Sequence, residues 1–590
     1  MMPSAQPQTP VGQYNPYPAY PLEPGMIAVG YDTLAAEMAR NALVTIDGYP
    51  GVLWENLRAQ IDAAVKNLGR QVHWVNVESA LLPPEEIDRR IAPYLGGSDP
   101  LFGFRCPCSL IDFFDPTKLA ALRPDPDVEI NILYGTGATL AGWNGPIFYA
   151  DVPKNEIQFR ARAGSVKNIG AEHALEPKPA YKRSYFVDWP AANQHKAELL
   201  PRIYAVIDAQ RAEEPTWMHG AALRATLRKM AHTWFRPRPW FEPGPWGGQW
   251  IKKQVPQLPQ DAPNYAWSFE LIAPENGVVF ESDGKLMEIT LDTLMFQEYE
   301  AVLGECAPNF RYEFPIRYDF LDTIDGGNLS VQVHPRPEYI RKQFGETFTQ
   351  DECYYILDCA PGARVYLGFQ VGIDPQEFEE ALTHSAETGQ AVDIDRYVYS
   401  VPVEKHDLLL IPNGTIHGAG IGNLVLEISA TPYIFTFKMY DWLRLDLDGK
   451  PRSLNIARAF ENLYIDRQGQ RIEQEFVSHP IEISAGEGWR IVHLPTHPNH
   501  FYDVHRFEFR GEIEVETGGS CHVLSLVEGQ TVWLDVNEAA PARFNYAETF
   551  VVPSAAGRYR LRSEGGDAVK VVTTFIKPAD QWAPGVVPGT

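Results

Sequence analysis

Asn328-Leu-Ser-Val-Gln-Val-His-Pro335 is the stretch that decides how this chain of 590 residues folds. Gln332 and His334 are two positions apart in an apolar, strand-like run, so both side chains project from the same face of the strand. Glutamine and histidine side chains offer oxygen and nitrogen atoms that bind divalent metals such as Zn²⁺. The stretch therefore predicts a β-domain that holds a metal site on one face of a strand.

Two further segments place polar residues at strand ends. Thr349-Gln-Asp-Glu-Cys-Tyr-Tyr-Ile-Leu357 places Glu352 at the start of an apolar strand, and Ile411-Pro-Asn-Gly-Thr-Ile-His417 ends in a Pro/Gly turn that leads to His417. The order of H-x-P, a downstream Glu and P-x-G-x-x-H resembles that in which a cupin barrel brings its metal ligands together. The alternative is that these are unrelated polar residues at strand ends.

The composition describes a globular protein with an acidic surface. Apolar residues make up 45% and charged residues 22%, and no apolar run approaches the roughly 20 residues of a membrane span. The formal charge of −25 argues against nucleic acid and anionic membranes as partners, whereas a locally positive pocket is still compatible with a small anionic substrate. Because the first residues lack a secretory signal and six cysteines are too few for a disulfide framework, we expect a cytoplasmic protein.

The order of strand and helix patterns predicts several domains. Alternating strands and helices indicate an α/β domain with a parallel sheet, and the Pro-rich segment that begins at Arg236 marks its end. Beyond that segment, short strand signals with turns between them predict two mainly-β domains. We expect residues 240–580 to fold without the first domain. The predicted units are a flexible Pro/Tyr-rich arm (1–26), the α/β domain (27–235), a metal-binding β-domain (236–475) and a second β-domain (476–590).

One strand pair is predicted near the C-terminus. Phe507, Phe509, Ile513 and Val515 alternate with charged residues, which is typical of half-buried strands. Gly511 lies between the two runs. The pattern predicts a strand pair that turns at this glycine.

Several motifs together resemble class I mannose-6-phosphate isomerases, which are zinc-dependent cupin enzymes. They are VQVHP, Glu352 before YYILD, GARVYLGF, LLLIPNGTIHGAG, NLVLEIS and FKMYDWLR, with PWGGQW at 245–250 as the entry motif and FYDVHRFEF, CHVLSLVEG and ETFVVPSAAGRYRL in a second cupin. The resemblance covers roughly residues 240–580. It implies two cupin jelly-roll domains and a metal site for Zn²⁺ or another divalent metal. The implied ligands are Gln332, His334, Glu352 and His417.

The resemblance also implies a reaction. An aldose–ketose isomerase moves a proton between C1 and C2 of an open-chain sugar through a cis-enediol, with a metal and an acid/base group beside the substrate. Glu427, in LVLEIS, matches an acidic position of the family, although a strand glutamate is more often exposed. Lys438 stands where the family has a catalytic arginine. The alternative is that Lys438 is an exposed polar residue on an alternating strand. Arg444 is a candidate substrate-binding residue or a salt-bridged surface arginine.

Two departures from the family leave the substrate open. Gln350-Asp351-Glu352 replaces the K-T-E of bacterial members, and Lys438 keeps the charge of the family's arginine without its bidentate fork. We expect mannose-6-phosphate/fructose-6-phosphate interconversion on a small-molecule sugar phosphate. The alternatives are an isomerase of a non-phosphorylated sugar, or a non-catalytic metal-binding cupin that acts as a sugar sensor or regulator. The sequence leaves the oligomeric state open.

The α/β domain carries a weaker resemblance. Val44-Thr-Ile-Asp-Gly-Tyr-Pro-Gly-Val52, between a strand and a helix, resembles a degenerate P-loop of uridine-kinase-like proteins. No G-x-x-x-x-G-K-[ST] motif is present there, because no lysine follows Gly51. We therefore expect no ATP chemistry from this domain, and a structural or regulatory α/β domain is the alternative.

Overall fold

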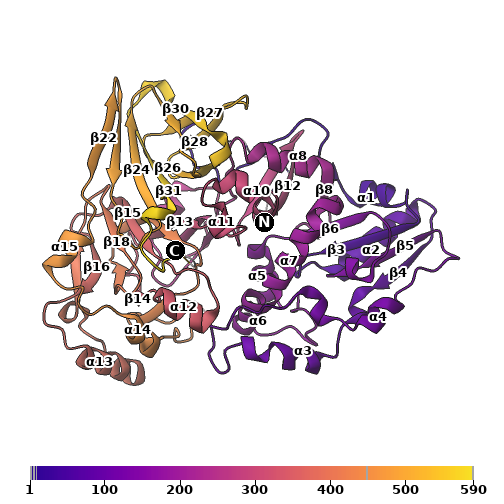
Figure 1. Cartoon of the computed structure of the whole chain (residues 1–590), viewed down its shortest axis with the longest axis horizontal. Coiled ribbons are helices and arrows are strands. Elements are labelled where there is room, and N and C mark those ends of the chain that lie inside the picture. Colours follow the sequence, from indigo (N-terminus) through magenta and orange to yellow (C-terminus); the bar gives the residue numbers. More distant parts are fainter. Residues whose placement is uncertain (1–2, 4, 6, 8, 447–448, 588–590) are drawn as a thin grey trace.

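The computed structural model describes residues 3, 5, 7, 9–446 and 449–587. Figure 1 shows an α/β part, in indigo to magenta, beside a β-rich part that ends in orange and yellow. Nowhere in these residues is a helix both long and apolar enough to cross a membrane.

The first part of the chain is built on a seven-stranded mixed sheet. Its strands are, in spatial order, β2 (Ala28–Val29), β8 (Thr216–His219), β7 (Ile203–Asp208), β6 (Ile147–Asp151), β3 (Leu43–Gly48), β5 (Ile130–Tyr134) and β4 (Val72–Asn76). The five strands from β7 to β4 pair in parallel, and β8 and β2 add antiparallel pairs at one edge. The residues of β5 and β6 are buried throughout, as expected for parallel strands covered on both faces.

Helices cover this sheet. They are α1 (Tyr31–Met38), α2 (Trp54–Asn67), α3 (Pro84–Ile91), α4 (Pro116–Ala121), α5 (Lys154–Arg162), α6 (Pro177–Arg183), α7 (Trp189–Leu199) and α8 (Gly220–Met230). In α2 the buried residues are Leu57, Ile61, Ala64 and Val65, whose spacing places them on one helical face. The alternation of strand and helix patterns thus corresponds to a layered α/β arrangement.

The segment that resembles a P-loop, Val44 to Val52, contains most of β3 and the turn after it, so it does not lie between a strand and a helix as the sequence predicts. The chain's own residues occupy this edge of the sheet. The carboxylate of Asp47 accepts hydrogen bonds from the backbone N–H and the hydroxyl of Thr139, at 2.9 and 2.6 Å. Nearby, Asp151 binds the ammonium of Lys196 at 2.9 Å and the backbone N–H of Thr290, from the β-rich part, at 2.9 Å. The kinase-like resemblance stays a prediction.

Two sheets form the first β-domain. One contains β18 (Leu408–Ile411), β15 (Glu352–Cys359), β20 (Asn423–Ala430), β13 (Ile316–Asp322), β10 (Trp267–Leu271) and β9 (Trp240–Glu242); the other contains β17 (Val398–Pro402), β16 (Arg364–Phe369), β19 (His417–Ala419), β14 (Val331–Val333) and β21 (Phe437–Tyr440). Tyr354 and Val425 of the first sheet share an apolar cluster with Val365 and Leu367 of the second. The sheets therefore pack face to face, and the prediction of a β-rich fold is confirmed.

Helices decorate the β-rich part at its ends. They are α9 (Trp250–Gln254), α10 (Asp292–Leu303), α11 (Ala307–Phe310), α12 (Pro337–Phe344), α13 (Pro375–Thr388), α14 (Ile456–Asn462) and α15 (Gln470–Glu475). Asp374 caps α13 by accepting hydrogen bonds from two backbone N–H groups, and Gly389 ends it in the left-handed conformation.

The last part of the chain forms two further sheets. The larger contains β22 (Ile481–Gly486), β23 (Trp489–Leu494), β24 (Tyr502–Phe509), β31 (Val569–Ile576), β26 (His522–Glu528) and β29 (Thr549–Val552), and the smaller contains β25 (Glu512–Glu516), β30 (Arg558–Ser563), β27 (Thr531–Val536) and β28 (Ala542–Asn545). The predicted pairing across Gly511 is wrong. β24 pairs with β23 and β31, whereas β25 pairs with β30, so Gly511 marks the point where the chain passes from one sheet to the other.

The prediction of a flexible arm over residues 1–26 is also wrong for the part that the structure describes. β1 (Tyr20–Pro21) joins β11 (Gly277–Ser282) and β12 (Lys285–Thr290) in a three-stranded sheet. Tyr14 is buried, and its hydroxyl donates a hydrogen bond to Glu270 at 2.5 Å. The Pro- and Tyr-rich composition serves here to bury aromatic rings against the β-rich part.

The predicted domains do not have separate cores. One continuous apolar cluster contains Leu227 of α8, Leu294 of α10 and Val551 of β29. At the predicted boundary Arg236 is buried and pairs with Glu548 of the last part at 2.8 Å. The Pro-rich segment, where the sequence predicts a domain boundary, is therefore packed between the parts of the chain.

Candidate metal centre

Strands of the first β-domain carry the four predicted metal ligands. Gln332 on β14 lies directly opposite His417, the first residue of β19. His334 follows the end of β14, and Glu352 is the first residue of β15. All four side chains are buried. The structure thus brings together residues that are up to 85 positions apart in the sequence.

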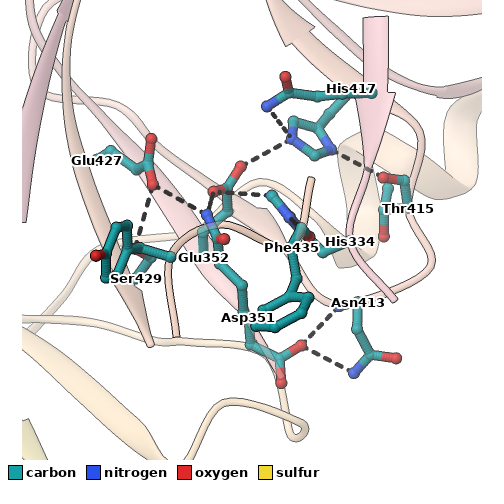
Figure 2. A network of polar contacts seen from close by, with 12 residues as sticks. His334, Asp351, Glu352, Asn413, Thr415, His417, Glu427, Ser429 and Phe435 are labelled. Carbon is teal, nitrogen blue, oxygen red and sulfur yellow. Dashed lines mark hydrogen bonds and ion pairs between the residues drawn. The ribbon is translucent and has the colours of Figure 1, made fainter. Parts of the chain in front are cut away.

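The two imidazoles face one carboxylate. Nε2 of His334 lies 3.1 Å from Oε2 of Glu352, and Nε2 of His417 lies 2.8 Å from Oε1 of the same residue. Figure 2 shows both rings turned toward Glu352. One ligand atom from each of the three residues lies within 4.8 Å of the other two, a spacing at which they could hold a metal ion.

Backbone carbonyls fix the tautomers of the two histidines. Nδ1 of His334 lies 3.0 Å from the carbonyl oxygen of Phe435, and Nδ1 of His417 lies 2.9 Å from that of Thr415. Because a carbonyl can only accept, each Nδ1 carries a proton, and Nε2 is the ring nitrogen that faces the carboxylate of Glu352. Either a proton on each Nε2 or one shared metal ion supplies the positive charge that this contact needs, and a backbone-bonded Nδ1–H is the usual support of a metal-binding histidine. The residues present therefore fit a divalent metal.

Glu352 and Gln332 complete the donor set. Burial alone would raise the pKa of Glu352, but the imidazoles of His334 and His417 hold that pKa well below its usual range. The amide of Gln332 lies 3.3 Å from Nε2 of His417, and its Oε1 accepts a hydrogen bond from Ser330 at 3.1 Å. A half-turn of this amide exchanges its nitrogen and oxygen, so Gln332 can offer a neutral oxygen ligand.

Asp351 holds the turn that precedes His417. Oδ1 of Asp351 accepts hydrogen bonds from the backbone N–H of Asn413 at 2.6 Å and from its side-chain amide at 2.9 Å (Figure 2). Gly414 follows with φ +74°, and a Cβ there would lie 2.4 Å from the ring of Tyr464. The Pro-Asn-Gly turn is thus shaped to deliver His417 to the site.

A second layer of charge lies beside the ligands. On β13 and β20, Asp319 is opposite Glu427 and Arg317 is opposite Ser429, so these side chains share the face that carries Glu352. Arg317 donates a hydrogen bond to Glu427 and pairs with Asp319 at 2.8 Å. Glu427, predicted as a catalytic residue, is therefore buried inside the barrel rather than exposed.

The charge of this layer also fits a divalent cation. Burial raises the pKa of Asp319 to about 7. The charge of Arg317 lowers this pKa, and the charge of Glu352 raises it. Burial likewise raises the pKa of Glu427 well above its usual range. When all three carboxyl groups of the site are ionised, one guanidinium leaves two negative charges unbalanced, and a divalent cation would balance them.

Arg317 and Asp319 escaped the sequence analysis. They alternate within Phe314-Pro-Ile-Arg-Tyr-Asp-Phe-Leu-Asp322, an otherwise apolar run. Two charged residues two positions apart on a buried strand point to one face, which is the same signal that identified Gln332 and His334.

Of the other two predicted site residues, Lys438 lines the site and Arg444 does not. Lys438 on β21 is opposite Gln332 and lines a cavity over the site. Burial lowers the pKa of Lys438 to about 8. Arg444 does not belong to the described lining of this cavity; its guanidinium binds Asp441 and a backbone carbonyl. The structure therefore does not bring Arg444 to the candidate site.

The cavity has a volume of about 940 Å³ and lies between the two parts of the chain. Gln332, Gln350 and Glu427 contribute to its lining from the metal side. Gln350 also connects two carboxylates, because its amide donates to Glu352 at 3.2 Å and to Glu427 at 3.4 Å. The candidate metal centre is thus adjacent to a space that can hold a small molecule.

Comparison with known proteins separates the two parts of the chain. Residues 30–232 match a family described as a domain of unknown function (DUF8485). The chain is 26% identical to mannose-6-phosphate isomerase of Streptococcus mutans over 285 residues, which are 48% of this chain and 81% of the relative. It is 24% identical to mannose-6-phosphate isomerase ManA of Bacillus subtilis over 304 residues, 52% of this chain and 88% of the relative.

Solved structures include similar proteins. The crystal structure of mannose 6-phosphate isomerase from Bacillus subtilis aligns with 58% of this chain and 99% of its own, at 20% identity and a TM-score of 0.48. A putative mannosephosphate isomerase from Archaeoglobus fulgidus aligns at 19% identity and a TM-score of 0.44, over 59% of this chain and 98% of its own. By sequence, about half of this chain is homologous to mannose-6-phosphate isomerases.

Proposed function

We propose that the protein is a metal-dependent aldose–ketose isomerase that interconverts mannose 6-phosphate and fructose 6-phosphate through a cis-enediol. Homologous relatives carry the name of this activity. The observation that supports the proposal most strongly is the pair of imidazoles that face the carboxylate of Glu352, beside a cavity lined by Glu427 and Lys438.

The proposed metal ligands are Gln332, His334, Glu352 and His417, and the proposed metal is Zn²⁺. Nitrogen and carboxylate ligands of this kind suit zinc and leave positions open for substrate. When bound, such a metal polarises the sugar carbonyl and stabilises the negative charge that develops on its oxygen.

Glu427 is the proposed acid/base group. Its Oε1 accepts hydrogen bonds from Arg317, from Ser429 at 3.2 Å and from Gln350 at 3.4 Å, and these contacts fix the carboxylate in the cavity wall. We assign the transfer of the proton between C1 and C2 to Oε2, the oxygen outside these contacts. A positioned group of this kind accelerates proton transfer by typically about 10²–10⁴-fold.

Lys438 is the proposed electrostatic partner of the reacting oxygens. Its position opposite Gln332 places the ammonium on the same face as a proposed ligand. A fixed cation in a poorly solvated site stabilises the negative charge of an enediolate. As a point charge, the ammonium does this without the bidentate contact that an arginine makes.

A coupled assay of mannose-6-phosphate and fructose-6-phosphate interconversion tests this function, with mannose and fructose run in parallel. The metal-loaded protein should turn over the phosphorylated sugars, and Glu427→Gln should lower kcat by about 10²-fold or more with metal content unchanged. Glu404→Gln, an exposed glutamate on the same domain, is the matched control. Equal rates for Glu427→Gln and the control would refute the role of Glu427. Turnover of only the neutral sugars would refute the substrate.

A further inference from the structure

The α/β part forms one side of the cavity. Its contributions come from Leu101 and Phe102, from α5, α6 and Ser184, and from the start of α7, whereas the remaining lining comes from the β-rich part. The lining side chains of the α/β part include Gln158, Phe159, Arg162, Lys178, Tyr181 and Trp189. The domain of unknown function therefore encloses the same space that the metal centre borders.

Polar contacts join the two sides of the cavity. The side-chain amide of Gln158 donates a hydrogen bond to the buried Glu275 at 2.7 Å. The hydroxyl of Tyr181 lies 3.2 Å from that of Tyr433 and 3.3 Å from Glu275, and Tyr433 donates to the same carboxylate. These bonds fix α5 and α6 against the β-rich part. The side of the cavity that the α/β part forms is therefore held in place by specific contacts.

The charges of the lining are unevenly distributed. Among the described residues, the lining contains the carboxyl groups of Glu242, Glu275, Asp319, Glu427 and Asp446, and the cationic groups of Arg162, Lys178, Arg317, Lys438 and Arg452. Arg317 pairs with Asp319 and Glu427, and Arg162 pairs with Glu242 at 3.0 Å. Glu275 is buried among hydroxyl and amide donors, and burial raises its pKa.

The other three cations of the lining are Lys178, Lys438 and Arg452. Asp446 is the remaining carboxyl group of the described lining, and it has an interaction of its own. Arg452 is held at 2.6 Å by Asp441, which also binds Arg444. Burial is the largest cause of the lowered pKa of Lys438. The charges of Arg452 and Lys178 lower this pKa further, while Asp441 and Asp446 raise it, so the three cations and two carboxylates lie in one electrostatic neighbourhood.

We propose that Lys178, supplied by the domain of unknown function, binds the phosphate group of the substrate together with Arg452. This inference rests on the proposed function and assigns to the α/β part the recognition of the phosphorylated end of the sugar. Lys178 is solvent-accessible, and no hydrogen bond or ion pair engages its ammonium within the described residues, so its charge is available to a ligand. The chain has a net charge of −25, so binding of a dianion requires a local cluster of cations that attracts it.

The test is Lys178→Ala beside Lys178→Arg and the control Lys167→Ala, which removes an exposed lysine of the same domain outside the lining. Lys178→Ala should raise KM for mannose 6-phosphate by about 10- to 100-fold, the effect of one hydrogen bond to a charged group, and leave kcat within about threefold. It should also weaken inhibition by inorganic phosphate and leave any turnover of mannose unchanged. Lys178→Arg should restore most of the affinity, because the charge is kept.

Calorimetric binding of mannose 6-phosphate to the wild-type protein separates the two proposals. Binding that Lys178→Ala weakens, in a protein without turnover, would refute the isomerase and support this site. An unchanged KM and unchanged phosphate inhibition in Lys178→Ala, in an active enzyme, would refute this site alone. A wild-type protein that neither binds nor isomerises the sugar phosphate would refute both.

Discussion

Replacing Lys438 with alanine is the sharpest test of the proposed chemistry. The side chain stands on β21 opposite Gln332 and lines the cavity. Burial lowers its pKa to about 8, so at pH 7 the ammonium form still exceeds the amine by roughly ten to one. The lysine therefore enters the reaction as a cation that is poorly solvated, and its field acts strongly on a nearby substrate.

The expected size of the effect follows from that position. Removing one preorganised electrostatic stabiliser lowers kcat by about 10²–10³-fold, or roughly 2.7–4 kcal/mol of transition-state stabilisation. Because the alanine removes a buried charge that folding disfavours, we expect no loss of thermal stability larger than that of an ordinary buried truncation. Lys438→Arg should keep the charge and retain measurable activity.

The assay is steady-state isomerisation of mannose 6-phosphate, with metal content measured on the same preparations. Lys342→Ala on α12, an exposed lysine of the same domain, is the control and should stay within about twofold of wild type. A Lys438→Ala enzyme with wild-type kcat and full metal content would show that the ammonium takes no part in the reaction. Arg317 or the metal alone would then have to stabilise the negative charge of the enediolate.

Three further outcomes are expected. His417→Ala should lose most of the divalent metal found per chain by metal analysis, while His384→Ala, on the exposed face of α13, should keep it; equal metal in the two would refute the ligand set. The fragment 236–590 should be insoluble or unfolded by circular dichroism, because its core is continuous with that of the α/β part; a folded, metal-binding fragment would show that the cores are separable. Burial raises the pKa of Glu270 to about 7, so the folded state holds this proton between about pH 4.5 and 7 while the unfolded chain releases it, and stability falls as pH rises through that window. Glu270→Gln should therefore unfold like wild type at pH 4.5 and gain roughly 3 kcal/mol over it by pH 8 in denaturant titrations; parallel pH profiles would contradict this.

The proposed metal ligands could be identified from the sequence because each lies in a local pattern. Gln332 and His334 are two positions apart on a strand and so share a face, and a Pro-Asn-Gly turn signal precedes His417. The same period would have identified Arg317 and Asp319 on β13. Local sequence therefore determines which strands carry chemistry and which way their side chains project.

The remaining features depend on contacts between distant segments. Nothing near Gly511 shows that β24 and β25 belong to different sheets, because strand pairing is decided by partners elsewhere in the chain. The docking of Tyr14 on Glu270 spans 256 residues. The cavity wall contributed by Lys178 follows from the shared interface of the two parts, so it has no signature in the sequence of either part.

The most direct measurement is isomerisation by the full-length protein before and after removal of its metal. A chelator-treated sample should lose mannose-6-phosphate/fructose-6-phosphate interconversion while retaining its fold, and about one equivalent of Zn²⁺ per chain should restore it, because two imidazoles and a carboxylate converge on one point. Full activity in a protein shown to be metal-free, or no interconversion by a folded protein carrying one metal per chain, would contradict a metal-dependent sugar-phosphate isomerase.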